Sequence, residues 1–200
     1  MLECLVIVDM QDYFIGDIGV INGNRIDTRR GYLVAQTIKH IKIAKKKGIP
    51  IICLEYDDIY YECDGITANW TCKEIRDELK YYKKAYYPLK DIDDGSEEVI
   101  DVLKGVQPRR GLARNGKRLH KWIKGKQKVS FTVCGVNLDA CVHDTVESLK
   151  YKGHTVRIIP EATRNVWDDK CIDINTVHRE FWMNRRPVKE TFDFLSLVMS

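Results

Sequence analysis

Short apolar runs alternate along the chain with longer segments in which apolar and polar residues repeat with a helical period. The first run, residues 2–8, is almost continuously apolar and rich in β-favouring residues, which is typical of a strand buried on both faces. Similar patterns predict further strands at 49–54, 81–85, 129–134, 155–159 and 187–191.

Amphipathic segments separate most of these runs. Residues 32–47 place their apolar side chains on one helical face, and Gly48 and Pro50 follow as helix-terminating residues. A second helix is expected over 169–182. The alternation predicts an α/β fold, a mostly parallel, Rossmann-like sheet of about six strands with helices on both faces. Ligands of such sheets bind beyond the carboxyl ends of the strands, where Asp9, Lys84 and residues 135–141 are expected to lie.

Length and composition fit a single domain over residues 1–200. The chain is 44% hydrophobic and 31% charged, close to the globular average. No apolar run reaches the roughly 18 residues needed to span a bilayer, so we expect no membrane association. The seven cysteines are an odd number, and several lie in apolar runs. Free thiols in a reducing compartment, and therefore a cytoplasmic location, are expected.

The formal net charge is +4, but it is spread unevenly, because residues 104–128 contain ten Lys and Arg and no acid. Residues 111–118 approach the phosphate-loop pattern, although Arg118 stands in place of the Ser or Thr that would hold magnesium. Leu119, Trp122 and Ile123 have helical spacing, which predicts a helix over 116–125 packed on the sheet. A solvated basic surface is favoured, and nucleic-acid binding is possible but not favoured.

Three side chains could carry chemistry. Cys141 follows a predicted strand and a turn at Gly135, in the first turn of a helix whose dipole would stabilise a thiolate. Asp9, at the end of the first strand, could be a general base, and Lys84 could lower the pKa of a neighbouring thiol. Each also has a structural interpretation when taken alone: a buried filler cysteine, a capping carboxylate and a solvated edge-strand lysine.

The segments around these residues resemble a known family. Residues 8–14 (VDMQDYF) and 133–142 (VCGVNLDACV) are similar in sequence, order and spacing to the signatures of the isochorismatase-like cysteine hydrolases. The resemblance implies a three-layer α/β/α fold and an Asp9, Lys84 and Cys141 triad, with Lys83 as the alternative lysine. It also implies a cis peptide between Val136 and Asn137, and an oxyanion hole formed by the N–H groups of Asn137 and Cys141. Phe14 and Leu138 are then expected in the substrate pocket.

The chain also departs from the family pattern. Nicotinamidases of this family hold a metal through an Asp and His pair, whereas residues 53–60 contain Asp57 and Asp58 but no histidine. We therefore expect no metal and no other cofactor. An insertion is predicted near 91–115, which prevents transfer of the family's substrate wall to this chain.

Together these patterns predict a cysteine-dependent hydrolase of a small amide, ureido or carbamoyl compound, acting through a thioester. One alternative is an isochorismatase-type vinyl-ether hydrolase. Another is a catalytically drifted member that binds nucleic acid or an acidic partner through its basic segment. The resemblance further implies a small-molecule substrate and self-association as a homo-oligomer.

Overall fold

The computed structural model describes residues 1–15, 28–56, 70–107 and 119–164. The predicted helix at 169–182, the predicted strand at 187–191 and the two carboxylates Asp57 and Asp58 lie outside these ranges. No helix in the described ranges is long and apolar enough to cross a membrane.

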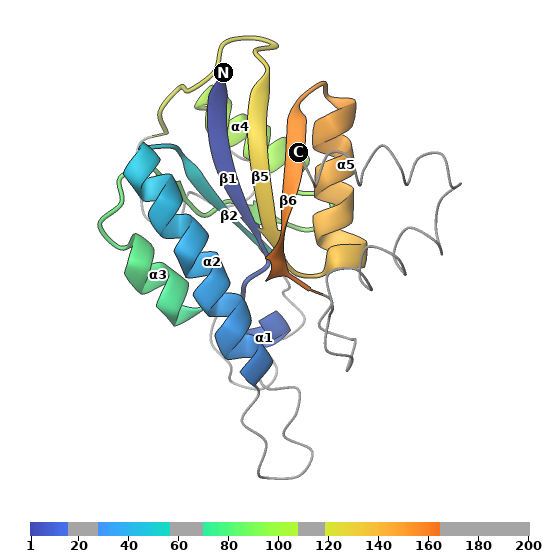
Figure 1. Cartoon of the computed structure of the whole chain (residues 1–200). Coiled ribbons are helices and arrows are strands. Elements are labelled where there is room, and N and C mark those ends of the chain that lie inside the picture. The colour runs from blue at the N-terminus through green and yellow to red at the C-terminus, as the bar shows by residue number, and fades with distance from the viewer. Residues whose placement is uncertain (16–27, 57–69, 108–118, 165–200) are drawn as a thin grey trace.

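A six-stranded parallel sheet forms the centre of the molecule (Figure 1). Its strands lie in the order β3-β2-β1-β5-β6, and β4 pairs with β2 beyond β3. The bounds of the strands are β1 Leu2–Val8, β2 Ile51–Tyr56, β3 Ala85–Tyr86, β4 Leu89–Lys90, β5 Val129–Gly135 and β6 Thr155–Thr163. The apolar first run is therefore the central strand, flanked by β2 and β5, which explains why its side chains are apolar toward both faces.

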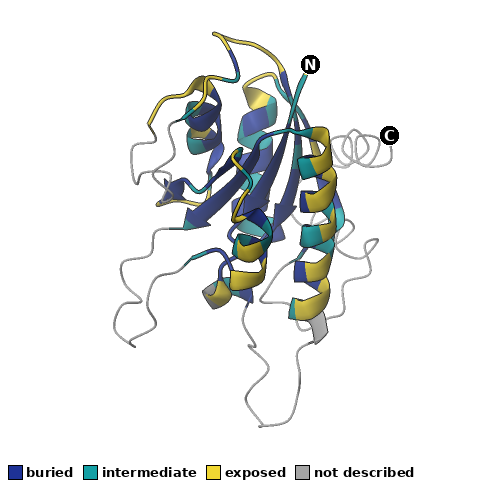
Figure 2. Cartoon of the chain, turned by 90° about the vertical axis from the view of Figure 1, so that its left-hand side faces the viewer, coloured by how far each residue is buried: buried dark blue, intermediate teal, exposed yellow. Residues whose placement is uncertain are grey.

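Helices cover both faces of the sheet, so the predicted three-layer α/β/α architecture is confirmed. On one face α2 (Thr28–Lys47) and α3 (Lys73–Leu79) pack against residues such as Ile7 and Cys53. On the other, α4 (Ser96–Lys104) and α5 (His143–Tyr151) pack against residues such as Val6 and Phe131. Figure 2 shows the buried sheet between these helices, whose outer surfaces are exposed.

Two predicted elements differ from the structure. The third strand begins at Ala85 rather than at residue 81, because residues 82–85 form a turn closed by the Ala85 N–H donating to the Tyr82 carbonyl. The helix predicted over 116–125 is absent from its described part, residues 119–125. Trp122 and Ile123 instead donate their N–H groups to the Leu103 carbonyl, and both side chains still pack on the sheet.

The region predicted as an insertion, 91–115, includes α4. Val99 and Leu103 on this helix are completely buried in the core, and Gly105 ends it in a left-handed conformation. This part of the region therefore belongs to the helical layer over the sheet.

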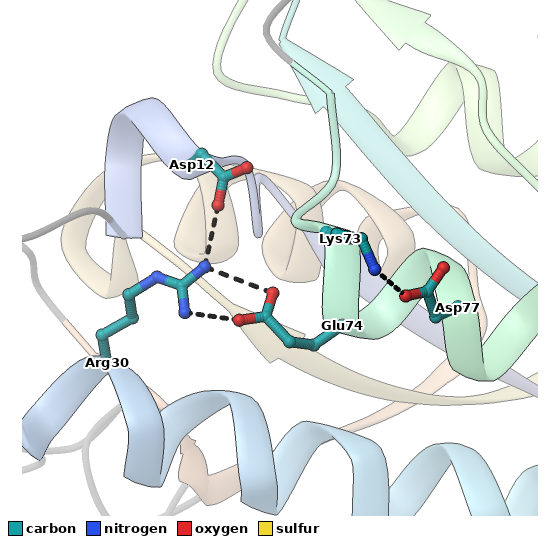
Figure 3. A network of polar contacts seen from close by, with 5 residues as sticks. All are labelled: Asp12, Arg30, Lys73, Glu74 and Asp77. Atoms are coloured by element: carbon teal, nitrogen blue, oxygen red, sulfur yellow. Dashed lines mark hydrogen bonds and ion pairs between the residues drawn. The ribbon is translucent and has the colours of Figure 1, made fainter.

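A polar network joins the short helix α1 (Asp12–Ile15) to α2 and α3 (Figure 3). The Arg30 guanidinium donates to Asp12 at 2.9 Å and to Glu74 at 2.8 Å, and the bond to Glu74 lowers the pKa of that carboxyl to about 2. Lys73 pairs with Asp77 one turn along α3. Because α1 follows β1 after three residues, the network fixes the chain just beyond the carboxyl end of the central strand.

Candidate active site

Asp9 lies immediately after β1, at the carboxyl edge of the sheet. Its side chain is 1% exposed, and its N–H donates to the Leu54 carbonyl at 3.1 Å. Its φ is +49°, and it is the one non-glycine residue with positive φ in the described part of the chain. Asp tolerates this left-handed conformation better than most residues because its short polar side chain can interact locally. The backbone thus turns here and holds a buried carboxylate against the ends of the neighbouring strands.

Lys90, the last residue of β4, supplies the positive charge beside this carboxylate. Its Nζ lies 3.0 Å from Asp9 Oδ2, and the side chain is fully buried. The ammonium group also donates to the Ile92 carbonyl at 3.0 Å and lies 4.5 Å from the centre of the Tyr56 ring. These contacts compensate part of the cost of burying the charge.

The lysine assignment made from the sequence is corrected here, because Lys84 lies at the opposite edge of the sheet. Its Nζ donates to the Gly48 carbonyl at 2.5 Å and lies 5.2 Å from the centre of the Trp122 ring. Its own carbonyl accepts the N–H of Ile51, the first residue of β2. Lys84, and Lys83 before it, therefore precede β3, whereas Lys90 ends β4 and pairs with Tyr56, the last residue of β2.

Cys141 reaches the same site from β5. The strand ends at Gly135, where a Cβ would lie 2.0 Å from the Val8 carbonyl oxygen, so only glycine fits between β5 and β1. A cis peptide between Val136 and Asn137 follows, at the position that the resemblance implied. One turn of π-helix, η2 (Leu138–Val142), then carries Cys141 into the site, where Sγ donates to Asp93 Oδ1 at 3.3 Å.

The pKa values of all three groups are raised, those of Asp9 and Cys141 mainly by burial and that of Lys90 by its neighbours. Burial raises the pKa of Asp9, and the nearby Lys90 and Cys141 offset this only in part. The pKa of Lys90 is raised as well, because the charges of Asp9 and Cys141 outweigh the effect of burial. Burial and the Asp9 carboxylate raise the pKa of the Cys141 thiol. The shift of the Cys141 pKa therefore runs opposite to the thiolate stabilisation expected from the helix dipole.

These shifts predict the alkylation behaviour of Cys141. In the wild-type protein we expect iodoacetamide labelling of this cysteine, followed by peptide mapping across pH, to give a midpoint above the ordinary thiol value of about 8.5. Asp9→Asn should lower the midpoint, because it removes a negative charge that opposes the thiolate and leaves the positive charge of Lys90. An unchanged or higher midpoint in Asp9→Asn would contradict the proximity of the two groups.

Two further residues hold the ends of these strands together. The Gln11 side chain accepts the Tyr56 N–H at 2.7 Å and donates to the Tyr56 carbonyl at 3.1 Å, which positions the end of β2. The Gly95 N–H donates to Thr145 Oγ1 at 3.0 Å and so ties the segment after Lys90 to the helix after Cys141. A Cβ at Gly95 would lie 2.5 Å from Leu54 Cδ1 and 3.0 Å from Lys90 Cδ, so a side chain there would displace one or both of these side chains.

The residues expected in the pocket lie around this centre. Phe14 is partly buried and contacts the Tyr56 ring edge to face, with 6.1 Å between the ring centres. Leu138 is 4% exposed and packs in the core beside Cys141. Asn137 caps η2, and its carbonyl accepts the Val142 N–H at 3.0 Å. The roles of these residues toward a substrate remain predictions.

Sequence reasoning missed Lys90 and Asp93. Both follow Tyr87 and Pro88, and proline occurs in sheets at edge strands, strand starts and bulges, so a second short strand could start at this proline. That signal would have moved the carboxyl end of the third strand from residue 85 to residue 90. Nothing in the sequence pattern singles out Asp93, because its contact with Cys141 depends on the path of the chain after β4.

The fold and this edge site place the protein in a known class. A family model described as the Isochorismatase domain matches residues 3–170. A search of curated protein sequences finds no match.

Solved structures of an amidase, a nicotinamidase and an isochorismatase share the fold. N-carbamoylsarcosine amidase from Thermoplasma acidophilum is 17% identical with a TM-score of 0.53, covering 90% of this chain and 93% of that one. A nicotinamidase from Bacillus subtilis is 13% identical with a TM-score of 0.54, covering 83% and 88%. An isochorismatase from Pseudomonas putida is 17% identical with a TM-score of 0.53, covering 80% and 70%.

The class is therefore that of the isochorismatase-like α/β hydrolases. Since the family model spans most of the sequence, this chain belongs to the isochorismatase family.

Proposed function

We propose that the protein hydrolyses a C–N bond in a small amide, ureido or carbamoyl compound, with Cys141 as nucleophile. The observation that carries the proposal is the buried ion pair between Asp9 and Lys90 at 3.0 Å, placed beside the Cys141 thiol at the carboxyl edge of the sheet. A carboxylate that can transfer protons, a nearby cation and a thiol nucleophile in one buried site are the elements of covalent acyl transfer.

In the proposed reaction Asp9 removes the thiol proton as Cys141 Sγ attacks the carbonyl carbon of the substrate. The N–H groups of Asn137 and Cys141 are assigned to the oxyanion. As the tetrahedral intermediate collapses, Asp9 returns the proton to the leaving nitrogen, and a thioester remains on Cys141. Water, deprotonated by Asp9, then attacks the thioester and releases the carboxylic acid and the thiol.

The pKa shifts support this division of roles. A base that must accept a thiol proton works best when its pKa is raised, and burial raises the pKa of Asp9. Lys90 stays protonated, because its pKa is raised too, and its charge stabilises the thiolate as it forms. A neutral resting thiol next to a basic carboxylate fits proton transfer during attack.

A substrate panel tests the proposal. Primary amides, ureido acids and carbamoyl compounds would be assayed for ammonia release, with intact-mass analysis of acid-quenched enzyme. We expect turnover of at least one class, accompanied by an acyl adduct that maps to Cys141. Asp9→Asn should lose turnover by about 100-fold or more, since general base catalysis contributes on that order. Turnover that is insensitive to Asp9→Asn and leaves no adduct would contradict the mechanism.

A further inference from the structure

The edge of the sheet opposite the candidate active site is strongly basic. Because the strands are parallel, the segments that precede β2, β3, β5 and β6 lie at this edge. These segments are 45–50 before β2, 80–84 before β3, 119–128 before β5 and 150–154 before β6, joined by 104–107 after α4, and none of them contains an acidic residue. We call these five segments the basic edge.

Thirteen lysines lie in the basic edge, and most are exposed. Lys45, Lys47 and Lys152 pair with carboxylates of neighbouring elements, and Lys150 pairs with Glu147 of its own helix. The lysines of 121–128 are all exposed and have no ion-pair partner within the described part of the chain. The basic segment seen in the sequence is thus one of several that the fold gathers on one surface.

The pKa of His154 is affected by lysines from several of these segments. Burial lowers the pKa of its imidazole, and the positive charges of Lys152, Lys104 and Lys128 lower it further. These three lysines come from three different segments of the basic edge. The sheet therefore brings together cations that are far apart in the sequence.

Two exposed tyrosines accompany the lysines. Tyr81 is 86% exposed, and the Lys80 ammonium lies 5.4 Å from its ring centre. Tyr151 is 94% exposed and stands between Lys150 and Lys152. Tyr81 precedes β3 and Tyr151 precedes β6, the strands at the two ends of the sheet order. With strands about 4.8 Å apart, the basic edge spans on the order of 20 Å between them.

We propose that the basic edge binds single-stranded nucleic acid. Exposed lysines that flank accessible aromatic rings are the arrangement that contacts phosphates and stacks bases without reading sequence. The rings favour this partner over an acidic protein or an anionic membrane, because the charges alone would serve any polyanion. The proposed hydrolase site lies at the other end of the strands, so this binding does not depend on the hydrolase function.

The test uses the full-length protein and a fluorescein-labelled 20-nucleotide oligothymidylate, with fluorescence anisotropy over a range of salt concentrations. The first variant is Lys124→Gln/Lys126→Gln/Lys128→Gln. The matched control, Lys39→Gln/Lys42→Gln/Lys73→Gln, removes the same charge from exposed positions on α2 and α3, outside the basic edge. We expect the basic-edge variant to reduce the slope of log affinity against log salt by about 2, at roughly 0.7 for each lost phosphate contact. The control should change the slope by much less.

A second variant, Tyr81→Ala/Tyr151→Ala, separates nucleic acid from other polyanions. We expect it to weaken oligothymidylate binding about tenfold or more, as loss of base stacking does, and to leave heparin binding unchanged. Equal effects of the two lysine variants would overturn the proposal. It would also be overturned if the tyrosine variant left oligothymidylate binding intact, or if vesicles containing phosphatidylserine bound more tightly than the oligonucleotide.

Discussion

Replacing Cys141 by alanine should reduce turnover by at least about 1,000-fold, as removal of a nucleophile does in other covalent hydrolases. The proposed thioester cannot form without Sγ, and neither Asp9 nor Lys90 can substitute for it. The folded structure should change little, because the substitution removes one sulfur atom and its hydrogen bond to Asp93. We expect a free energy of unfolding within about 1 kcal/mol of the wild type.

Cys134→Ala is the matched control for this experiment. Cys134 is also buried and lies on β5, the strand that precedes η2, but its side chain faces the α2 and α3 layer. Its pKa is raised to about 12 by burial, so it remains a neutral thiol. Steady-state assays should show near-normal turnover in Cys134→Ala. If Cys141→Ala kept full turnover instead, the reaction would not use a thiol, and vinyl-ether hydrolysis would become the leading alternative.

Lys90→Gln should reduce kcat/KM by about 100-fold or more, whereas Lys84→Gln should leave it within about twofold of the wild type. Lys90 is the positive charge that stabilises both the Asp9 carboxylate and the thiolate forming on Cys141. Lys84 contacts Gly48 and Trp122 at the far edge of the sheet, where it can affect stability but not the reaction. The pair of variants decides between the lysine chosen from sequence and the one chosen from structure.

The pH profile gives a readout that loss of stability would not produce. Asp9 must be a carboxylate to accept the thiol proton, so kcat/KM falls as pH drops through the raised pKa of Asp9. Without Lys90, the effect of burial on Asp9 is no longer opposed, and the acid limb should move to higher pH. Because breaking a buried pair costs about 3–5 kcal/mol, circular dichroism should establish the temperature range in which the variant is folded. An acid limb that stays in place would argue against the Asp9–Lys90 pair.

Much of the fold follows from local patterns in the sequence. The continuous apolar runs of β1, β5 and β6 and the one-sided pattern of α2 predict their elements correctly, because burial on both faces or on one face leaves a direct trace in the residue order. The third strand was harder to predict. In this region β3 and β4 have two residues each, and their pairing is set by β2 rather than by their own composition.

The candidate site likewise contains residues that local sequence patterns predict and residues that only tertiary packing brings together. Asp9 and Cys141 occur in motifs whose strand ends are clear, so their places at the carboxyl edge could be predicted. The lysine could not, because Lys84 and Lys90 both lie two or three residues after a pair of tyrosines and only the observed end of β4 distinguishes them. The contact of Asp93 with Cys141 arises from tertiary packing alone.

The left-handed turn at Asp9 limits how this position can change during evolution. Glutamate would retain the acid but has a larger side chain and tolerates positive φ poorly, whereas asparagine and glycine adopt it readily. A descendant that loses this carboxylate should therefore be found with asparagine or glycine at position 9 and the fold intact. Loss of the acid at this position is therefore compatible with the fold, whereas replacement by the longer acid strains the turn.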